Sequence, residues 1–202
     1  MTELGRRERK KLATRQALID AAVDLFTERG FDGTTVAQIA ERADLSARTF
    51  FLHFATKEDV LMGGSIDRVD LVLGVLHAAQ PGERAVDVLA RALHSMIDDF
   101  PPREAELTWL RLRLGAVNPT FQAGVFRRRH EAEVEYTRAL LERFGDEFDE
   151  LGAAATVSAA MGATYAAAVT AIRRNDAPEG VRAAMHRAVD IALHGTGTLP
   201  AR

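Results

Sequence analysis

The sequence predicts an all-α protein with a small N-terminal helical domain followed by a larger helical domain. Apolar residues recur at helical spacing in almost every segment, and no segment alternates apolar and polar residues as a strand would. Capping patterns are concentrated near residues 30–60, which indicates several short helices there. The 202 residues can bury a sizeable core, and the lack of cysteine excludes disulfides, thiolate zinc sites and a cysteine nucleophile.

The first two helices are predicted from apolar spacing and from end signals. The first covers about residues 8–29, and Gly30 follows it as a C-terminal cap. The second follows Thr35, whose side chain caps the helix, while Gln38 completes a capping box. Its apolar residues end at Ala43, so this helix has only about two turns.

Two further capped helices complete the N-terminal part. Ser46 is the expected cap of a third short helix over about residues 47–54. Thr56 caps the next helix with Asp59 at its third position, and we expect this helix to continue through Val69. Three capped helix starts therefore follow one another closely.

The rest of the chain is predicted to be helical, with proline, glycine and asparagine marking the boundaries. The expected helices cover about residues 83–100, 103–114, 119–144, 151–172 and 178–194. Between Glu150 and Arg173 lie 22 uncharged residues, ten of them alanine. That length could cross a membrane, but alanine lacks the lipophilicity that favours insertion, so we interpret the segment as a helix buried within the protein.

Charge is unevenly distributed along the chain. Residues 1–16 carry six basic and two acidic side chains, a net charge of +4, so the remainder carries −7. This pattern is typical of a basic arm that meets a polyanion, although a solvated helix start is the alternative. The charge-rich N-terminus does not resemble a signal peptide, so we expect a cytoplasmic protein.

Residues 36–54 have the spacing of a helix-turn-helix. The two helices of this motif cross closely, so the first needs a small residue, which Ala40 supplies. The turn needs a residue that tolerates positive φ, and Asp44 does so better than most non-glycines. Leu45 and Phe50 are the expected inward apolar residues.

A family resemblance makes this motif more specific. The segments GFDGTTV at 30–36, IA at 39–40, LSARTFFLHF at 45–54 and KEDVL at 57–61, with Ala43, together resemble the N-terminal domain of TetR-family transcriptional regulators. The resemblance covers residues 10–62. It implies a three-helix helix-turn-helix DNA-binding domain over residues 1–62 and a helical effector-binding and dimerisation domain over residues 63–202.

The resemblance also implies a function. It predicts a homodimeric repressor, not an enzyme, that binds double-stranded DNA at a palindromic operator and is released by a small apolar or aromatic effector, without a cofactor or a membrane. By resemblance, the expected DNA contacts are Thr35, Ala47, Arg48, Thr49, Phe51, His53 and Lys57. Ala47, Arg48 and Thr49 would face base edges, and Arg48 is the one of these three able to contact guanine in bidentate fashion.

Alternatives and departures remain for several of these positions. Phe51 could be a core residue, His53 could cap local backbone, and Lys57 could be a solvated charge. Asp44 stands where the family commonly has glycine, and it places a negative charge near DNA. Position 51 is commonly tyrosine, so Phe51 lacks a hydroxyl for a phosphate.

The alanine-rich helix is the predicted dimer interface. Two neighbouring i+4 rows contain only small residues, which allows another helix to approach closely. The predicted interface residues are Ala155, Ala159, Gly162, Ala163, Ala166, Ala167 and Ala171. Packing against the preceding helix of the same chain is the alternative. A third row containing Val157, Met161, Tyr165 and Val169 is expected to face the interior.

The family's effector cavity would be lined mainly by apolar and aromatic residues. The candidates are Met96, Phe100, Trp109, Leu112, Phe121, Phe126, Met161 and Tyr165, although each could be plain core. An effector-less DNA-binding protein of the same fold is a further alternative.

A helical metalloprotein is less consistent with the sequence. None of the six histidines has Asp or Glu three residues before it, as a di-iron bundle requires. His186, Asp190 and His194 share one helix face, which we interpret as a solvated stripe rather than a zinc site, so no metal is predicted.

Overall fold

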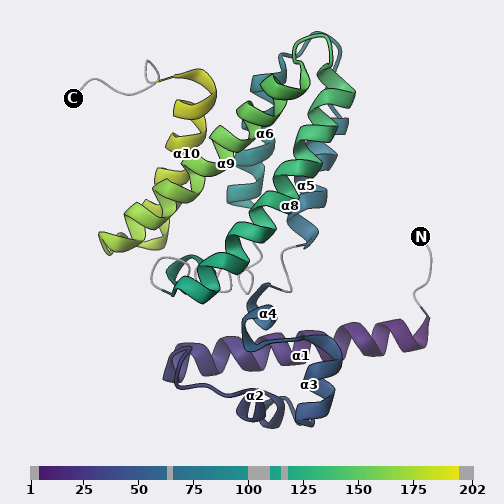
Figure 1. Ribbon diagram of the computed structural model, residues 1–202, viewed down its shortest axis with the longest axis vertical. Helices are drawn as coiled ribbons and strands as arrows, with labels where there is room; N and C mark the ends of the chain where they lie inside the picture. Colours follow the sequence, from purple (N-terminus) through teal and green to yellow (C-terminus); the bar gives the residue numbers. More distant parts are fainter. Residues whose placement is uncertain (1–4, 63–65, 100–109, 115–117, 196–202) are drawn as a thin grey trace.

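The computed structural model describes residues 5–62, 66–99, 110–114 and 118–195, and every regular element in these ranges is a helix. Figure 1 shows two parts: α1 runs across the base beside α2 and α3, while the later helices form an upright bundle above α4. The all-α prediction is therefore confirmed.

The N-terminal part consists of α1 (Arg6–Arg29), α2 (Val36–Arg42), α3 (Ala47–His53) and α4 (Lys57–Met62). The predicted caps are present. Thr35 accepts a hydrogen bond from the Gln38 amide and donates its own amide to the Gln38 side chain at 2.9 Å. Ser46 accepts from the Thr49 amide at 3.1 Å, and Thr56 forms the same reciprocal box with Asp59.

The core of the N-terminal part lies between α1 and the three short helices. Leu18, Ile39 and Phe50 are fully buried there. Phe121 of α8 joins the same cluster, with its ring centroid 6.1 Å from that of Phe31. The bundle is thus anchored to the N-terminal part by an apolar contact as well as by the chain.

The bundle consists of α5 (Ile66–His77), α6 (Ala85–Asp98), α8 (Pro119–Phe144), α9 (Glu150–Arg173) and α10 (Pro178–His194). Its core includes Leu89, Leu93 and Val157, all fully buried. The helix expected from Thr56 through Val69 is helical where it is described, as α4 and the start of α5, and residues 63–65 lie outside the described residues. Of the helix expected over 103–114, residues 110–114 are described, and these are helical.

The polar face of α10 is not the solvated stripe that we expected. Asp190 accepts from His94 at 3.0 Å, His186 lies 2.8 Å from an Asp98 oxygen, and His194 lies 3.0 Å from Asp87. All these partners belong to α6, so the stripe joins two helices. No group of three or more metal-ligating side chains with a suitable arrangement occurs in the ranges that the structure covers.

The alanine-rich helix α9 is buried on one face only. Ala153, Val157 and Ala160 are inaccessible, whereas Ala155 and Ala159 are exposed in the single chain. By length and composition alone α9 could cross a membrane. In the bundle it packs against α8 and α10. Within the single chain, the helix is therefore buried on one face, and the face that carries the predicted interface alanines is exposed.

Candidate DNA-binding surface and effector cavity

The turn between α2 and α3 has the geometry that the sequence predicted. Asp44 adopts a φ of 56°, in the left-handed region. The Leu45 amide donates to the Ala40 carbonyl oxygen at 2.8 Å across the turn, and Ala40 is buried at the helix crossing. A short residue at position 40 lets α3 approach α2 and fixes the direction in which α3 leaves the domain.

Helix α3 presents its first turn to solvent. Ala47 and Arg48 are exposed, and Thr49 is half-buried with its hydroxyl 2.9 Å from that of Ser46. Within the described part of the chain, no hydrogen bond or ion pair engages the Arg48 side chain. Arg48 is therefore available to a ligand, whereas the Thr49 hydroxyl is shared with the helix cap.

The outer face of α3 is unusually apolar. Phe51 is 58% exposed and Leu52 is 73% exposed, so the alternative that Phe51 is a core residue is wrong for this chain. The Phe51 ring touches Phe50 edge-on, with centroids 5.5 Å apart, which holds it in place. Exposed apolar side chains on such a helix are suited to thymine methyl groups in a major groove.

Thr35 is exposed at the start of α2, but its hydroxyl already takes part in the capping box with Gln38. The helix cap therefore fixes the orientation of the Thr35 hydroxyl that a DNA phosphate would contact. His53 lies at the end of α3, and its Nδ1 is buried without a hydrogen-bond partner among the described residues. Burial, followed by the charges of Lys11 and Arg15, lowers the pKa of His53.

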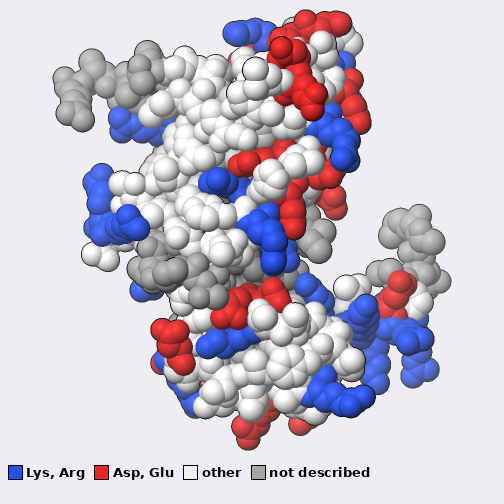
Figure 2. Space-filling view, viewed as in Figure 1, with Lys and Arg blue, Asp and Glu red and all other residues white. Residues whose placement is uncertain are grey.

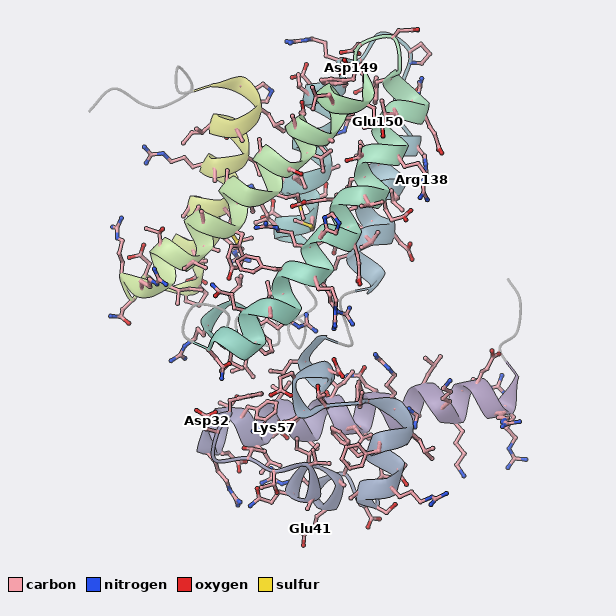
Figure 3. The ribbon with its side chains drawn as sticks, in the orientation of Figure 1. Asp32, Glu41, Lys57, Arg138, Asp149 and Glu150 are labelled. Carbon is pink, nitrogen blue, oxygen red and sulfur yellow. The ribbon has the colours of Figure 1, made fainter. Side chains whose placement is uncertain are left out.

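Lys57 connects the start of α4 to the segment between α1 and α2. Its ammonium donates to the carbonyl oxygens of Phe31 at 2.7 Å and Thr34 at 2.9 Å, and it lies 4.2 Å from the centre of the Phe31 ring. Figure 3 shows Lys57 beside the segment that carries Asp32. Lys57 is therefore not a solvated charge, and one ammonium proton is left for a further acceptor.

The N-terminal turns of α1 form a basic projection. The exposed cations are Arg6, Arg7, Arg9, Lys10 and Lys11. Figure 2 shows blue side chains around this projecting end, while red side chains gather at the far end over the turn between α8 and α9. In Figure 3 that far end carries Asp149 and Glu150. The basic arm predicted from the sequence therefore projects from one end of the molecule, away from a group of acidic side chains at the other end.

A cavity of about 400 Å³ lies inside the bundle, between α5, α8 and α9. Four of the predicted effector residues line it: Met96, Leu112, Met161 and Tyr165. Phe100 and Trp109 lie outside the described residues. The volume is within the range of small-molecule pockets.

Two predicted cavity residues lie elsewhere. Phe121 is fully buried in the core of the N-terminal part, because the first turn of α8 points towards Phe31 rather than into the bundle. Phe126 is 40% exposed and stacks edge-on against Tyr165, with centroids 5.5 Å apart, so it contacts a lining residue without lining the cavity.

The cavity is less apolar than we expected, because four half-buried arginines contribute to its wall. They are Arg68, Arg111, Arg128 and Arg129. A signal for two of them was present in the sequence. Arg127, Arg128 and Arg129 are consecutive on α8, and side chains about 100° apart on a helix cannot all face solvent. The contributions of Arg68 and Arg111 depend on how distant helices pack.

Arg111 also links the cavity to the N-terminal part. Its Nε donates to the carbonyl oxygen of Leu61, near the end of α4. The Nε of Arg129 lies 3.0 Å from Oε1 of Glu133, which makes an ion pair, but its N–H does not point at that oxygen and so does not form a hydrogen bond. The cavity wall is thus in direct contact with the helix that joins the two parts.

The outer surface of α9 matches most of the predicted dimer interface. Ala155, Ala159 and Ala166 are exposed, and Gly162, Ala163 and Ala167 are half-buried. Ala171 is 3% exposed and packs with Val181 of α10 in its own chain, so it leaves no surface for a partner. Of the predicted interior row, Val157 is buried and Met161 and Tyr165 line the cavity, whereas Val169 is half-buried.

Comparisons with known proteins agree with this geometry. Residues 18–62 match the family model described as bacterial regulatory proteins, tetR family, and residues 83–196 match the MftR C-terminal domain model, which covers more than half of the chain. The HTH-type transcriptional repressor Rv3405c of Mycobacterium tuberculosis is 34% identical over 166 residues, covering 72% of this chain and 80% of the relative. The chain belongs to the TetR family.

Other TetR-family proteins extend the comparison. The HTH-type transcriptional regulator TcmR of Streptomyces glaucescens is 32% identical over 151 residues, covering 72% of this chain and 67% of TcmR. These relatives are transcriptional regulators, so this TetR-family chain is a DNA-binding regulator rather than an enzyme.

A solved structure shows the shared TetR fold. Thermus thermophilus FadR, a TetR-family repressor in complex with lauroyl-CoA, superposes with a TM-score of 0.61 at 22% identity, covering 93% of this chain and 97% of FadR. The architecture of an N-terminal helix-turn-helix domain with a C-terminal helical ligand-binding domain, inferred from the motif, is therefore confirmed.

Proposed function

We propose that this TetR-family regulator is a repressor that binds a palindromic operator as a homodimer and is released by a small, largely apolar molecule. The observation that carries the proposal is the outer face of α3. Arg48 stands there unengaged by the described residues, beside the exposed side chains of Phe51 and Leu52. Arginine reads guanine, and apolar side chains read thymine methyl groups, so this face is suited to a mixed base sequence.

The basic turns of α1 support DNA as the partner of the same part of the molecule. Five exposed cations in two turns supply the sequence-independent attraction that a short reading helix lacks. We assign DNA binding to residues 1–62 and effector binding and dimerisation to residues 63–202. The assignment is supported by the two apolar clusters, one in the N-terminal part and one in the bundle.

A second copy of the chain is the proposed occupant of the outer face of α9. Small exposed side chains let a partner helix approach closely, and the surface over α9 is largely uncharged in Figure 2. A two-fold dimer would present two copies of α3, which accounts for a palindromic operator.

Contacts at the junction supply a route from cavity to DNA. Arg111 lines the cavity and donates to the Leu61 carbonyl oxygen, while Phe121 packs beside Phe31. A ligand that displaces Arg111 or the start of α8 would move α4 relative to the bundle and change the spacing of the two reading helices. FadR of Thermus thermophilus, which holds lauroyl-CoA, supports an effector that is at least partly apolar.

The proposal is tested by selecting bound sequences from random DNA duplexes with the full-length protein. We expect an enriched palindrome, whose half-sites are one helical turn apart or a multiple of it. Enrichment of a single half-site would contradict the dimer, and no enrichment would contradict specific recognition. Effectors are then screened by release of the selected duplex, and failure of all partly apolar molecules to release it would favour an effector-less protein.

A further inference from the structure

The interior of the cavity is basic, although charged residues of both signs contribute to its wall. Of the lining carboxylates, Asp70 and Glu131 are exposed, and Glu135 pairs with Arg138 at 3.1 Å. Figure 3 shows Arg138 on the outer side of α8. The four lining arginines are all half-buried, as is Glu135, and Arg129 pairs with Glu133. Half-buried arginines therefore outnumber half-buried carboxylates in the cavity wall.

Arg128 is the lining arginine whose charge is least compensated. No hydrogen bond or ion pair of its side chain occurs within the described residues. Burial is the main cause that lowers the pKa of Arg128. The charges of Glu131 and Asp59 oppose this effect, and those of Arg15 and Arg127 add to it. A half-buried cation that forms no direct ion pair with a described carboxylate is costly, and an anion in the cavity would offset that cost.

Tyr136 brings a second polar group to the same cavity. Its side chain is 1% exposed and lines the cavity, yet the hydroxyl has no hydrogen-bond partner among the residues that the structure covers. A buried tyrosine hydroxyl ordinarily finds a partner. Burial raises the pKa of Tyr136, so the hydroxyl remains a donor. Such a donor favours an acceptor atom inside the cavity.

Arg128 and Tyr136 lie on one wall, and methionines lie on the others. Arg128, Ala132 and Tyr136 follow one another at i, i+4 and i+8, so they face the cavity from the same side of α8. Met96, Met161 and Met185 come from three other helices. Methionine adapts its shape to apolar ligands, which suits a flexible chain.

We propose that the cavity binds an amphipathic organic anion, with its carboxylate or equivalent group on the α8 wall at Arg128 and Tyr136 and its alkyl or aryl chain among the methionines. The inference rests on the proposed function, because it names the chemical class of the effector. It adds a negatively charged head group to the small apolar or aromatic effector that the sequence led us to expect.

Three ligands with the same ten-carbon chain separate the effect of head-group charge on binding from the effect of the apolar chain. They are decanoate, methyl decanoate and decylamine. Binding to the DNA-free protein is measured by isothermal titration calorimetry below the aggregation concentration of each probe. We expect decanoate to bind at least tenfold more tightly than the uncharged ester, and decylamine to bind most weakly. Equal affinity for acid and ester, preference for the amine, or absence of saturable decanoate binding would each overturn the inference.

Two variants test the assigned residues separately. Arg128→Gln should weaken decanoate binding about tenfold and leave the ester unchanged, because only the acid carries the charge that Arg128 compensates. Tyr136→Phe should weaken both ligands, because both present a carbonyl or carboxylate oxygen to the hydroxyl. Arg127→Gln is the matched control. Arg127 is next to Arg128 in the chain, but its side chain is 66% exposed and does not line the cavity.

Calorimetry measures ligand binding to the DNA-free protein, whereas the proposed function is tested by release of the operator. A failure of one can therefore be told apart from a failure of the other. Decanoate that binds with the expected dependence on Arg128 but does not release the operator would support the ligand class and contradict induction. Release by neutral probes alone, with no effect of Arg128→Gln on decanoate affinity, would support induction and overturn the ligand class.

Discussion

The ammonium of Lys57 donates a hydrogen bond of 2.7 Å to the carbonyl oxygen of Phe31, 26 residues earlier in the chain. A second bond to the Thr34 carbonyl oxygen holds the other side of the same segment. Lys57 therefore closes the N-terminal domain by joining the first turn of α4 to the segment that precedes α2. This structural role adds to the phosphate contact that its position in the motif implies.

Substitution of Lys57 by methionine should therefore destabilise the protein as well as weaken DNA binding. The change removes the Lys57 donor from the Thr34 carbonyl oxygen and leaves the Phe31 carbonyl oxygen with the Thr34 amide at 3.3 Å, which costs about 1–3 kcal/mol. Urea unfolding measures the loss, and Lys11→Met, at an exposed position, is the control. Unchanged stability of Lys57→Met would show that the ammonium serves DNA alone.

Arg48 should supply base recognition. Arg48→Ala is expected to cost about 1–3 kcal/mol on the operator and to relax the preference at one base pair in each half-site. Affinities for the operator, for single-base variants and for random DNA provide the measurement. Lys10→Ala should instead weaken all duplexes alike and reduce the salt slope by about one unit. Equal losses on operator and random DNA for Arg48→Ala would reject its role.

Asp44 combines a left-handed backbone with a negative charge in the turn of the motif. Asp44→Gly should stabilise the turn by up to about 1 kcal/mol, because glycine adopts positive φ without strain. Both Asp44→Gly and Asp44→Asn should bind DNA more tightly, because each removes a charge that repels phosphate. The gain in affinity should shrink as salt is raised. If only Asp44→Gly bound DNA more tightly, the gain in affinity would come from the backbone conformation and not from loss of the charge.

His53 should make stability and DNA binding respond to pH in opposite directions. Its pKa in the folded protein lies below the ordinary value of 6.5, so the unfolded chain binds more protons as the pH falls through 6.5. Stability is therefore lost on acidification through that range. A nearby DNA phosphate favours the charged imidazole, so affinity for DNA should rise over the same range.

Thermal melting and DNA titration between pH 7.5 and 5.5, about one unit on either side of 6.5, measure the two responses of His53. His53→Gln should reduce both slopes. If acidification lowers stability through His53 but leaves the His53-dependent part of DNA affinity unchanged, the imidazole does not contact phosphate.

Substitution of Ala159, which is exposed in the single chain, tests the proposed subunit interface without disturbing the core of the subunit. Ala159→Glu places a charge on the exposed face of α9, so a close helix crossing between subunits should fail while the subunit still folds. Sedimentation velocity should show a monomer that binds the palindrome weakly. Ala13→Glu, at an exposed position of α1, should remain dimeric. A dimeric Ala159→Glu protein with unchanged melting would place the interface elsewhere.

Local interactions explain why much of the DNA-binding domain could be predicted from sequence. The caps at Thr35, Ser46 and Thr56 act within three residues, and the positive φ of Asp44 depends on its own side chain. The α-helical class, the helix-turn-helix and the family follow from such short-range patterns. The helix expected from Thr56 through Val69 is helical in its described parts, and residues 63–65 within it lie outside the described residues.

Tertiary structure decided which residues meet across long separations. Periodicity shows which face of α8 is apolar, but only the packing of α5, α8 and α9 places Arg128 and Tyr136 at a cavity and Phe121 in the neighbouring core. The same is true of the α10 histidines, which find carboxylates on α6 about a hundred residues away. The sequence by itself determined the helices, the motif and the family, because these depend on contacts within a few residues. The charge inside the cavity and the exposed face of α9 depend on how whole helices pack, and only the folded chain determines that.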